Sequence, residues 1–159
     1  MENVSRFQAA AEAERTLRAA LQTGLAVLCD ESDWPLARLT WLEGNEPLQL
    51  WTVRPGLEPL REAWAAAGAG ASWAARVAAA GRPLAFAFEM AEVPPEFATR
   101  VQAAGLRYAL AFPLFEGAEV AGAIEVCCKD PCPFDGLRES LLRLGKQLGH
   151  IAERKRTAA

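Results

Sequence analysis

The predicted architecture starts from two largely apolar runs joined by a short turn. The first run is Arg107-Tyr-Ala-Leu-Ala-Phe-Pro-Leu-Phe115, the turn is Glu116-Gly-Ala118, and the second run is Glu119-Val-Ala-Gly-Ala-Ile-Glu-Val-Cys-Cys-Lys129. The two long runs are rich in aromatic and branched residues, and the three residues between them contain a central glycine. Gly117 permits the positive φ that a tight hairpin needs. We therefore predict two antiparallel strands over 107–115 and 119–129.

Two residues inside these strands carry separate expectations. Pro113 removes a donor from the ladder of backbone hydrogen bonds, so it should mark a bulge or a position without such a bond. Gly122 has no side chain, so it should leave room on a central strand for another group to approach.

A second hairpin is predicted upstream, where runs at 36–42 and 48–53 flank the turn residues 43–47. Alternation along the first run puts Leu39 and Trp41 on one face of the sheet and Arg38 and Thr40 on the other. Residues 83–88 form a further short strand candidate.

Helical patterns alternate with these strands. Apolar residues recur at helical spacing over about 4–25, and the polar segment Asp30-Glu-Ser-Asp33 is expected to be a turn. Residues 56–81 are predicted to be helical, with a break at Gly68-Ala-Gly70 and a second helix over 72–80. A short helix over 96–104 should end at Gly105 in a left-handed cap.

The last helix, about 135–155, has the most regular pattern in the chain. Its apolar positions follow spacings of three and four residues, typical of a heptad seam: Phe134, Leu137, Leu141, Leu144, Leu148 and Ile151. Asp135 is placed to cap the start of this helix. The seam can pack on the chain's own sheet, continue into a dimer, or do both. We expect Leu137, Leu141, Leu144, Leu148 and Ile151 to form a dimer seam.

This order of elements predicts an α+β fold in a single domain, residues 1–159. A central antiparallel sheet of five to six strands, with the pocket region, occupies about 35–129. The N- and C-terminal helices should pack on one face, with short helices and loops over the other.

Composition narrows the classes of partner. Among 159 residues, 17 basic against 20 acidic side chains give a formal charge of −3, which argues against nucleic acid. No apolar run reaches the roughly 18 residues that span a membrane, and the N-terminus lacks a signal peptide. The clustered cysteines (Cys29, Cys127, Cys128 and Cys132) favour a reduced, soluble protein of the cytoplasm.

From Gly70 onward the sequence resembles a GAF domain, a small-molecule-sensing regulatory domain related to PAS. The resemblance rests on three segments: Gly70 to Arg76-Val77 with Ala80-Gly-Arg-Pro83; Gly105 to Leu114 with Gly117 and Val120 to Glu125; and Pro133-Phe-Asp135 opening a Leu-rich helix. It implies a ligand cavity bounded by the hairpin, the middle helices and the third and fourth strands.

Several ligands known for such domains are disfavoured here. Cyclic-nucleotide-binding members carry an aspartate where this chain has Arg138, so that position cannot pair with Lys129. Linear tetrapyrroles are usually attached at Cys-His, a dipeptide absent from this chain. Haem needs an axial ligand, and the sole histidine, His150, lies in the last helix. The cofactor, if any, is left unknown.

The cysteines also suggest two alternative functions, a metal site and a thiol enzyme. Cys127, Cys128 and Cys132 lack a nearby fourth zinc ligand, so we interpret them as buried apolar residues. Stand-alone GAF proteins of about this length include free-methionine sulfoxide reductases, whose chemistry uses cysteines around the third strand and the loop after it. Residues 82–105, the matching stretch here, contain no cysteine. No catalytic residue is assigned, and this enzyme class remains an alternative.

Aromatic residues dominate the region where the resemblance places a ligand. At least half of them are expected to be ordinary core, while aromatic residues with a polar atom could orient a ligand. Two charged residues could add complementarity. The pocket candidates are Trp51, Trp73, Arg76, Phe86, Phe88, Glu89 and Tyr108.

The expected function is that of a non-catalytic bacterial sensor domain that forms a homodimer through its terminal helices. An output module such as a histidine kinase or a cyclase would follow if the domain is part of a longer chain. The alternatives are the thiol reductase and a degenerate dimerisation scaffold with a filled pocket.

Overall fold

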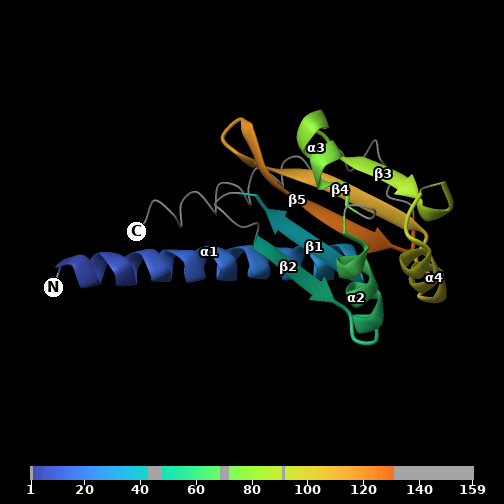
Figure 1. Cartoon of the computed structure of the whole chain (residues 1–159), viewed down its shortest axis with the longest axis horizontal. Helices are drawn as coiled ribbons and strands as arrows, with labels where there is room; N and C mark the ends of the chain where they lie inside the picture. The colour runs from blue at the N-terminus through green and yellow to red at the C-terminus, as the bar shows by residue number, and fades with distance from the viewer. Residues whose placement is uncertain (1, 43–47, 69–71, 91, 131–159) are drawn as a thin grey trace.

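In the described part of the chain, five strands form one antiparallel sheet with the order β2-β1-β5-β4-β3. The computed structural model (Figure 1) describes residues 2–42, 48–68, 72–90 and 92–130. The strands are β1 (Leu36–Trp41), β2 (Leu48–Val53), β3 (Leu84–Ala87), β4 (Tyr108–Glu116) and β5 (Glu119–Cys128). The third strand is shorter than predicted, because Phe88–Met90 forms a 3₁₀ turn, η2.

Both predicted hairpins are confirmed. Strand β1 pairs with β2, β4 pairs with β5, and β5 also pairs with β1, which joins the two hairpins into one sheet. Gly117, between β4 and β5, has the expected positive φ of 64°. Local turn chemistry was therefore sufficient to predict each hairpin, while the β1–β5 pairing joins distant parts of the chain.

The space beside Gly122 is taken by the neighbouring strand. Gly122 pairs with Trp41 of β1, and a Cβ added there would overlap the carbonyl oxygen of Thr40. The approach expected at this glycine is thus made by β1 backbone. Pro113 itself lies in regular register opposite Ala123, and the register shift between β4 and β5 falls further along, between Leu114 and Phe115.

The first helix, α1 (Glu2–Ser32), is longer than predicted. The expected turn at 30–33 is wrong for its first three residues, because the apolar stripe continues through the buried Leu28 and Cys29. The helix ends at Ser32. Asp33 follows it with a φ of 54°, and the N–H of Trp34 donates to the carbonyl of Cys29. Figure 1 shows the N-terminal part of α1 projecting beyond the sheet.

Three short helices follow the predicted pattern: α2 (Glu58–Ala67), α3 (Ala74–Ala80) and α4 (Pro95–Ala103). Helix α2 ends at Gly68, the first residue of the expected break, where φ is 57°. Gly105 follows α4 with the predicted left-handed conformation, φ 74°.

The sheet separates two hydrophobic clusters. On one face, Leu21 and Leu25 of α1 pack against Leu39, Phe112 and Ile124 of the strands. On the other face, residues of α2, α3 and α4 pack against Leu36, Cys127 and a set of alanines. This arrangement confirms the α+β class. The predicted last helix and its seam lie outside the described residues.

No helix in the described ranges combines the length and the apolar character needed to cross a membrane.

Candidate functional site

A buried ion pair lies at the centre of the sheet face that α2, α3 and α4 cover. Arg38 of β1 and Glu125 of β5 are partners in the strand register, so their side chains leave the sheet side by side. Arg38 donates to Glu125 Oε1 from Nε at 3.1 Å and from Nη2 at 2.9 Å. The second oxygen, Oε2, accepts the backbone N–H of Trp73 at 2.7 Å, which ties the start of α3 to the sheet.

This pair is enclosed by aromatic rings. The Arg38 guanidinium lies 4.6 Å from the centroid of Trp64 and 5.3 Å from that of Trp51, an arrangement favourable for cation–π attraction. Arg38 and Glu125 are only 4% and 0% exposed. Burial raises the pKa of the Glu125 carboxyl, and the Arg38 charge and the Trp73 N–H act in the opposite direction.

The rings around the pair form one connected layer. Its centroid separations run from 5.0 Å, for Trp73 and Phe86, to 6.2 Å, for Trp73 and Phe88. The sheet leaves space for these rings because its residues beneath them are small: Ala109, Ala111 and Ala123. The members of this aromatic layer are Trp51, Trp64, Trp73, Phe86, Phe88 and Phe97.

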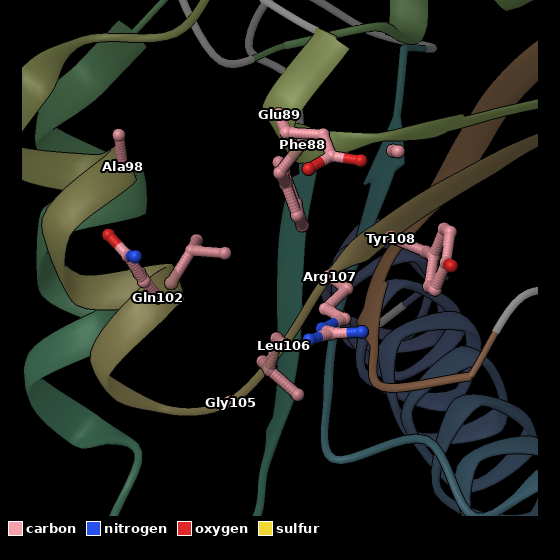
Figure 2. A pocket seen from close by; sticks show the side chains of 10 residues that line it. Phe88, Glu89, Ala98, Gln102, Gly105, Leu106, Arg107 and Tyr108 are labelled. Atoms are coloured by element: carbon pink, nitrogen blue, oxygen red, sulfur yellow. The ribbon is translucent and has the colours of Figure 1, made fainter.

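A cavity of about 510 Å³ lies beside this layer, between α4, η2 and the start of β4. Figure 2 shows α4 on one side, with Ala98 and Gln102, and the start of β4 on the other, with Arg107 and Tyr108. Phe88 and Glu89 border it from η2. The lining residues are Ala87, Phe88, Glu89, Ala98, Val101, Gln102, Gly105, Leu106, Arg107 and Tyr108.

The structure places three of the seven predicted pocket residues at this cavity: Phe88, Glu89 and Tyr108. The Tyr108 ring also packs against the cluster beneath α1. Trp51, Trp73 and Phe86 belong to the aromatic layer and do not line this cavity, and neither does Arg76, which is exposed on α3.

Sequence reasoning missed Arg38, Glu125 and Arg107 as site residues. The available signal was a charge inside an otherwise apolar strand: Arg38 is the single charge of β1, and Glu125 is the single charge of β5 after its first residue, Glu119. Their partnership depends on the pairing of β1 with β5, 87 residues apart in the chain, which no local pattern reveals. The sequence pattern predicts Arg107 only as the first residue of a strand over 107–115.

The cysteines in the described ranges are all buried: Cys29, Cys127 and Cys128. Burial raises the pKa of the Cys29 thiol to about 11, and it raises that of Cys127 well above its usual range. These thiols are therefore protonated at neutral pH. Among the residues that the structure describes, no three His, Cys, Asp or Glu side chains gather in a group that could hold a metal ion. Cys132 lies outside that set.

Comparison by sequence finds no relative: no family model and no curated protein matches the chain. Solved structures match over nearly its whole length at low identity. The blue-light absorbing form of the PixJ GAF domain from Thermosynechococcus elongatus has a TM-score of 0.61 and 15% identity, covering 92% of this chain and 90% of that one.

Two further structures match similarly. A GAF domain/HD domain protein from Geobacter sulfurreducens has a TM-score of 0.58 and 12% identity over 89% of this chain and 94% of its own. The type II free methionine-R-sulfoxide reductase from Thermoplasma acidophilum has a TM-score of 0.63 and 9% identity over 89% and 96%. With the sheet order, the helices on both faces and the glycine and proline pattern of 70–125, these matches establish that the chain has the fold of a GAF domain.

Proposed function

We propose that this chain is a sensor domain that binds a small molecule in the cavity between α4, η2 and β4. One observation carries the proposal: Phe88 both lines the cavity and belongs to the aromatic layer. A cavity of about 510 Å³ lies within the roughly 300–1,000 Å³ that is usual for small-molecule sites.

The same contact supports a route for the signal. Phe88 packs 5.7 Å from Phe97 of α4 and 6.2 Å from Trp73, measured between ring centroids. The backbone N–H of Trp73 in turn donates to Glu125 on the central strand. A ligand that moves Phe88 would thus disturb groups tied to the middle of the sheet.

Output would pass through the terminal helices of a homodimer. The projecting N-terminal part of α1 and the heptad seam predicted at Leu137, Leu141, Leu144, Leu148 and Ile151 support this part of the proposal. Most of the stability of a helix in a protein comes from tertiary packing of one face, so pairing with a second helix is the role we propose for this part of α1. A second module, such as the HD domain named in one structural neighbour, is the expected recipient. The cytoplasm is the expected compartment.

A thiol reductase has less support. Attack on a sulfoxide needs a thiolate, and burial holds Cys29 and Cys127 in the protonated form at neutral pH. The enzyme neighbour is only 9% identical. We expect the unchanged chain and a variant with all four cysteines changed to serine to show the same reductase activity, at background level.

Ligand binding is tested by filling the cavity. Native mass spectrometry of freshly purified protein and thermal shifts across a metabolite panel should identify a ligand, and its binding should be followed by tryptophan fluorescence, since Trp73 lies next to Phe88. Ala98→Trp places a large side chain in the cavity and should abolish binding. The matched control is Thr99→Trp, which changes the neighbouring exposed residue of α4 and should bind normally.

The opposite results would overturn the proposal. A protein that carries no molecule and shows no thermal shift with any metabolite class would be a dimerisation scaffold, in line with the filled aromatic layer. A ligand that binds Ala98→Trp as well as the unchanged chain would occupy another part of the molecule.

A further inference from the structure

The charges at the cavity specify a class of ligand. We propose that the cavity binds a zwitterion of the α-amino-acid type with an apolar side chain, held by Glu89 at its ammonium group and by Arg107 at its carboxylate. This inference rests on the proposed function, because it names the ligand of the same cavity.

The first support is that opposite charges border one cavity without neutralising each other. Glu89 enters from η2 and Arg107 from the start of β4, and both line the space. Neither side chain makes an ion pair or hydrogen bond with another residue in the described ranges. The nearby charges on α4, Glu96 and Arg100, already pair with each other at 3.4 Å.

The backbone holds these two side chains in relation to each other. The N–H of Phe88 donates to the carbonyl oxygen of Arg107 at 2.8 Å, so η2 is bonded directly to the start of β4. Glu89 is the residue after the donor, Phe88, on η2. Arg107 is the acceptor itself and directly precedes β4. Figure 2 shows Glu89 and Arg107 at the same side of the cavity, across from Gln102 of α4.

The remaining walls suit an apolar side chain. Phe88, Val101 and Leu106 line the cavity, and Val101 and Leu106 belong to the buried core of this face. An amino acid with an aliphatic or aromatic side chain would bury that group here while its charged end stays near the mouth, where Glu89 and Arg107 are exposed. Guanidinium is suited to carboxylate because it can donate two parallel hydrogen bonds.

One-charge ligands of the same shape would use only half of the site. A carboxylate without an ammonium group would meet Arg107 but leave Glu89 beside it as a repelling charge. An amine without a carboxylate would meet Glu89 and be repelled by Arg107. A zwitterion can pair with both the Glu89 carboxylate and the Arg107 guanidinium, and it carries no net charge.

The test uses the full chain and calorimetric titration. The apolar L-amino acids valine, leucine, isoleucine, methionine and phenylalanine are titrated first. L-phenylalanine is then compared with 3-phenylpropanoate, which lacks the ammonium group, and with 2-phenylethylamine, which lacks the carboxylate. We expect the zwitterion to bind about tenfold more tightly than either analogue, as one charge-assisted contact would give.

Two variants assign the charges. Arg107→Gln should weaken the binding of phenylalanine about tenfold and should not weaken the binding of 2-phenylethylamine. Glu89→Gln should likewise weaken the binding of phenylalanine about tenfold and should not weaken the binding of 3-phenylpropanoate. Matched controls are Arg18→Gln on α1 and Glu119→Gln at the β4–β5 turn, both exposed and absent from the cavity lining. These controls should leave every affinity unchanged.

The outcomes separate this inference from the proposed function. If no apolar amino acid binds, or if both cavity variants bind phenylalanine normally, the inference is wrong. If another metabolite then binds and Ala98→Trp abolishes that binding, the proposed function stands without it. If no metabolite of any class binds, both fail.

Discussion

Arg38 and Glu125 place two opposite charges where water does not reach, on the face of the sheet that also carries the aromatic layer. Removing a charge from water is costly, and their mutual attraction repays this only with good geometry and further hydrogen bonds. Both conditions are met here, since Glu125 accepts from Arg38 and from the Trp73 N–H. The exposed pair Arg54–Asp33, with side chains 50% and 89% exposed, offers a contrast within the same chain.

At this scale we predict that Glu125→Gln is strongly destabilising. The amide keeps an acceptor for Trp73 but removes the charge that compensates Arg38, so the free energy of unfolding should fall by about 3 kcal/mol or more. Arg54→Ala, which breaks the exposed pair, should cost about 0–1 kcal/mol. Urea denaturation followed by circular dichroism measures both.

A double variant isolates the cause. Adding Arg38→Met to Glu125→Gln removes the buried guanidinium charge that the Glu125 carboxylate no longer balances, and it should recover part of the lost stability. If the double variant loses more unfolding free energy than the two single variants lose together, the loss comes from packing and the charge argument is wrong.

At the scale of elements, the two hairpins could be predicted because their signals are local. Alternation correctly placed Leu39 and Arg38 on opposite faces, and Gly117 and Gly105 take the positive φ values expected of them. The end of α1 was misplaced, because the polar residues at 30–32 outweighed the apolar stripe that continues to Cys29. That stripe is needed to cover the sheet, a requirement that appears only when the strands are assembled.

Gly122 gives the sharpest prediction about an element. Its missing side chain lets β1 approach β5, so Gly122→Ala would force a methyl group onto the Thr40 carbonyl and part the two central strands. We expect a loss of about 3 kcal/mol, read from the urea midpoint, since overpacking against backbone cannot be relieved by a side-chain rotation.

The control is a glycine that serves conformation alone. Gly117 has open space around it and φ of 64°, which asparagine tolerates, so Gly117→Asn should cost less than about 1 kcal/mol. Equal losses for the two variants would mean that close strand approach is not what Gly122 provides.

At the scale of the whole molecule, the prediction concerns association between two copies of the chain. The long α1 projects beyond the sheet, and the sequence after residue 133 carries a heptad pattern that favours pairing between helices. A dimer would join the two terminal helices of each chain to those of a second copy. This would convert a small change near Phe88 into a change at a shared interface.

We predict that Leu144→Lys or Leu148→Lys yields a folded monomer in sedimentation analysis, because a buried lysine opposes a helical seam. Gln147→Lys introduces the same charge between the seam positions and should leave the dimer intact. A dimer that survives both leucine changes would rule out the seam as the interface.

In the candidate site, some pocket residues could be predicted from the sequence, and others were decided by the packing of the folded chain. Phe88, Glu89 and Tyr108 are predicted as pocket candidates from the elements that the family resemblance places around a ligand, and they line the cavity. Trp51, Trp73 and Phe86 were predicted with them but fill the space over Ala109, Ala111 and Ala123. Which aromatic ring faces a cavity and which fills the core depends on the size of the residues opposite it.

Periodicity and turn residues in the chain were enough to predict the two hairpins, the three short helices and the α+β class, since each signal spans only a few neighbouring residues. Assembly of the sheet decided the rest. It brought Arg38 opposite Glu125, closed the strands around Gly122, and left a cavity where η2 meets α4 and β4. These features depend on close packing between segments far apart in sequence, and close packing is a property of the assembled molecule.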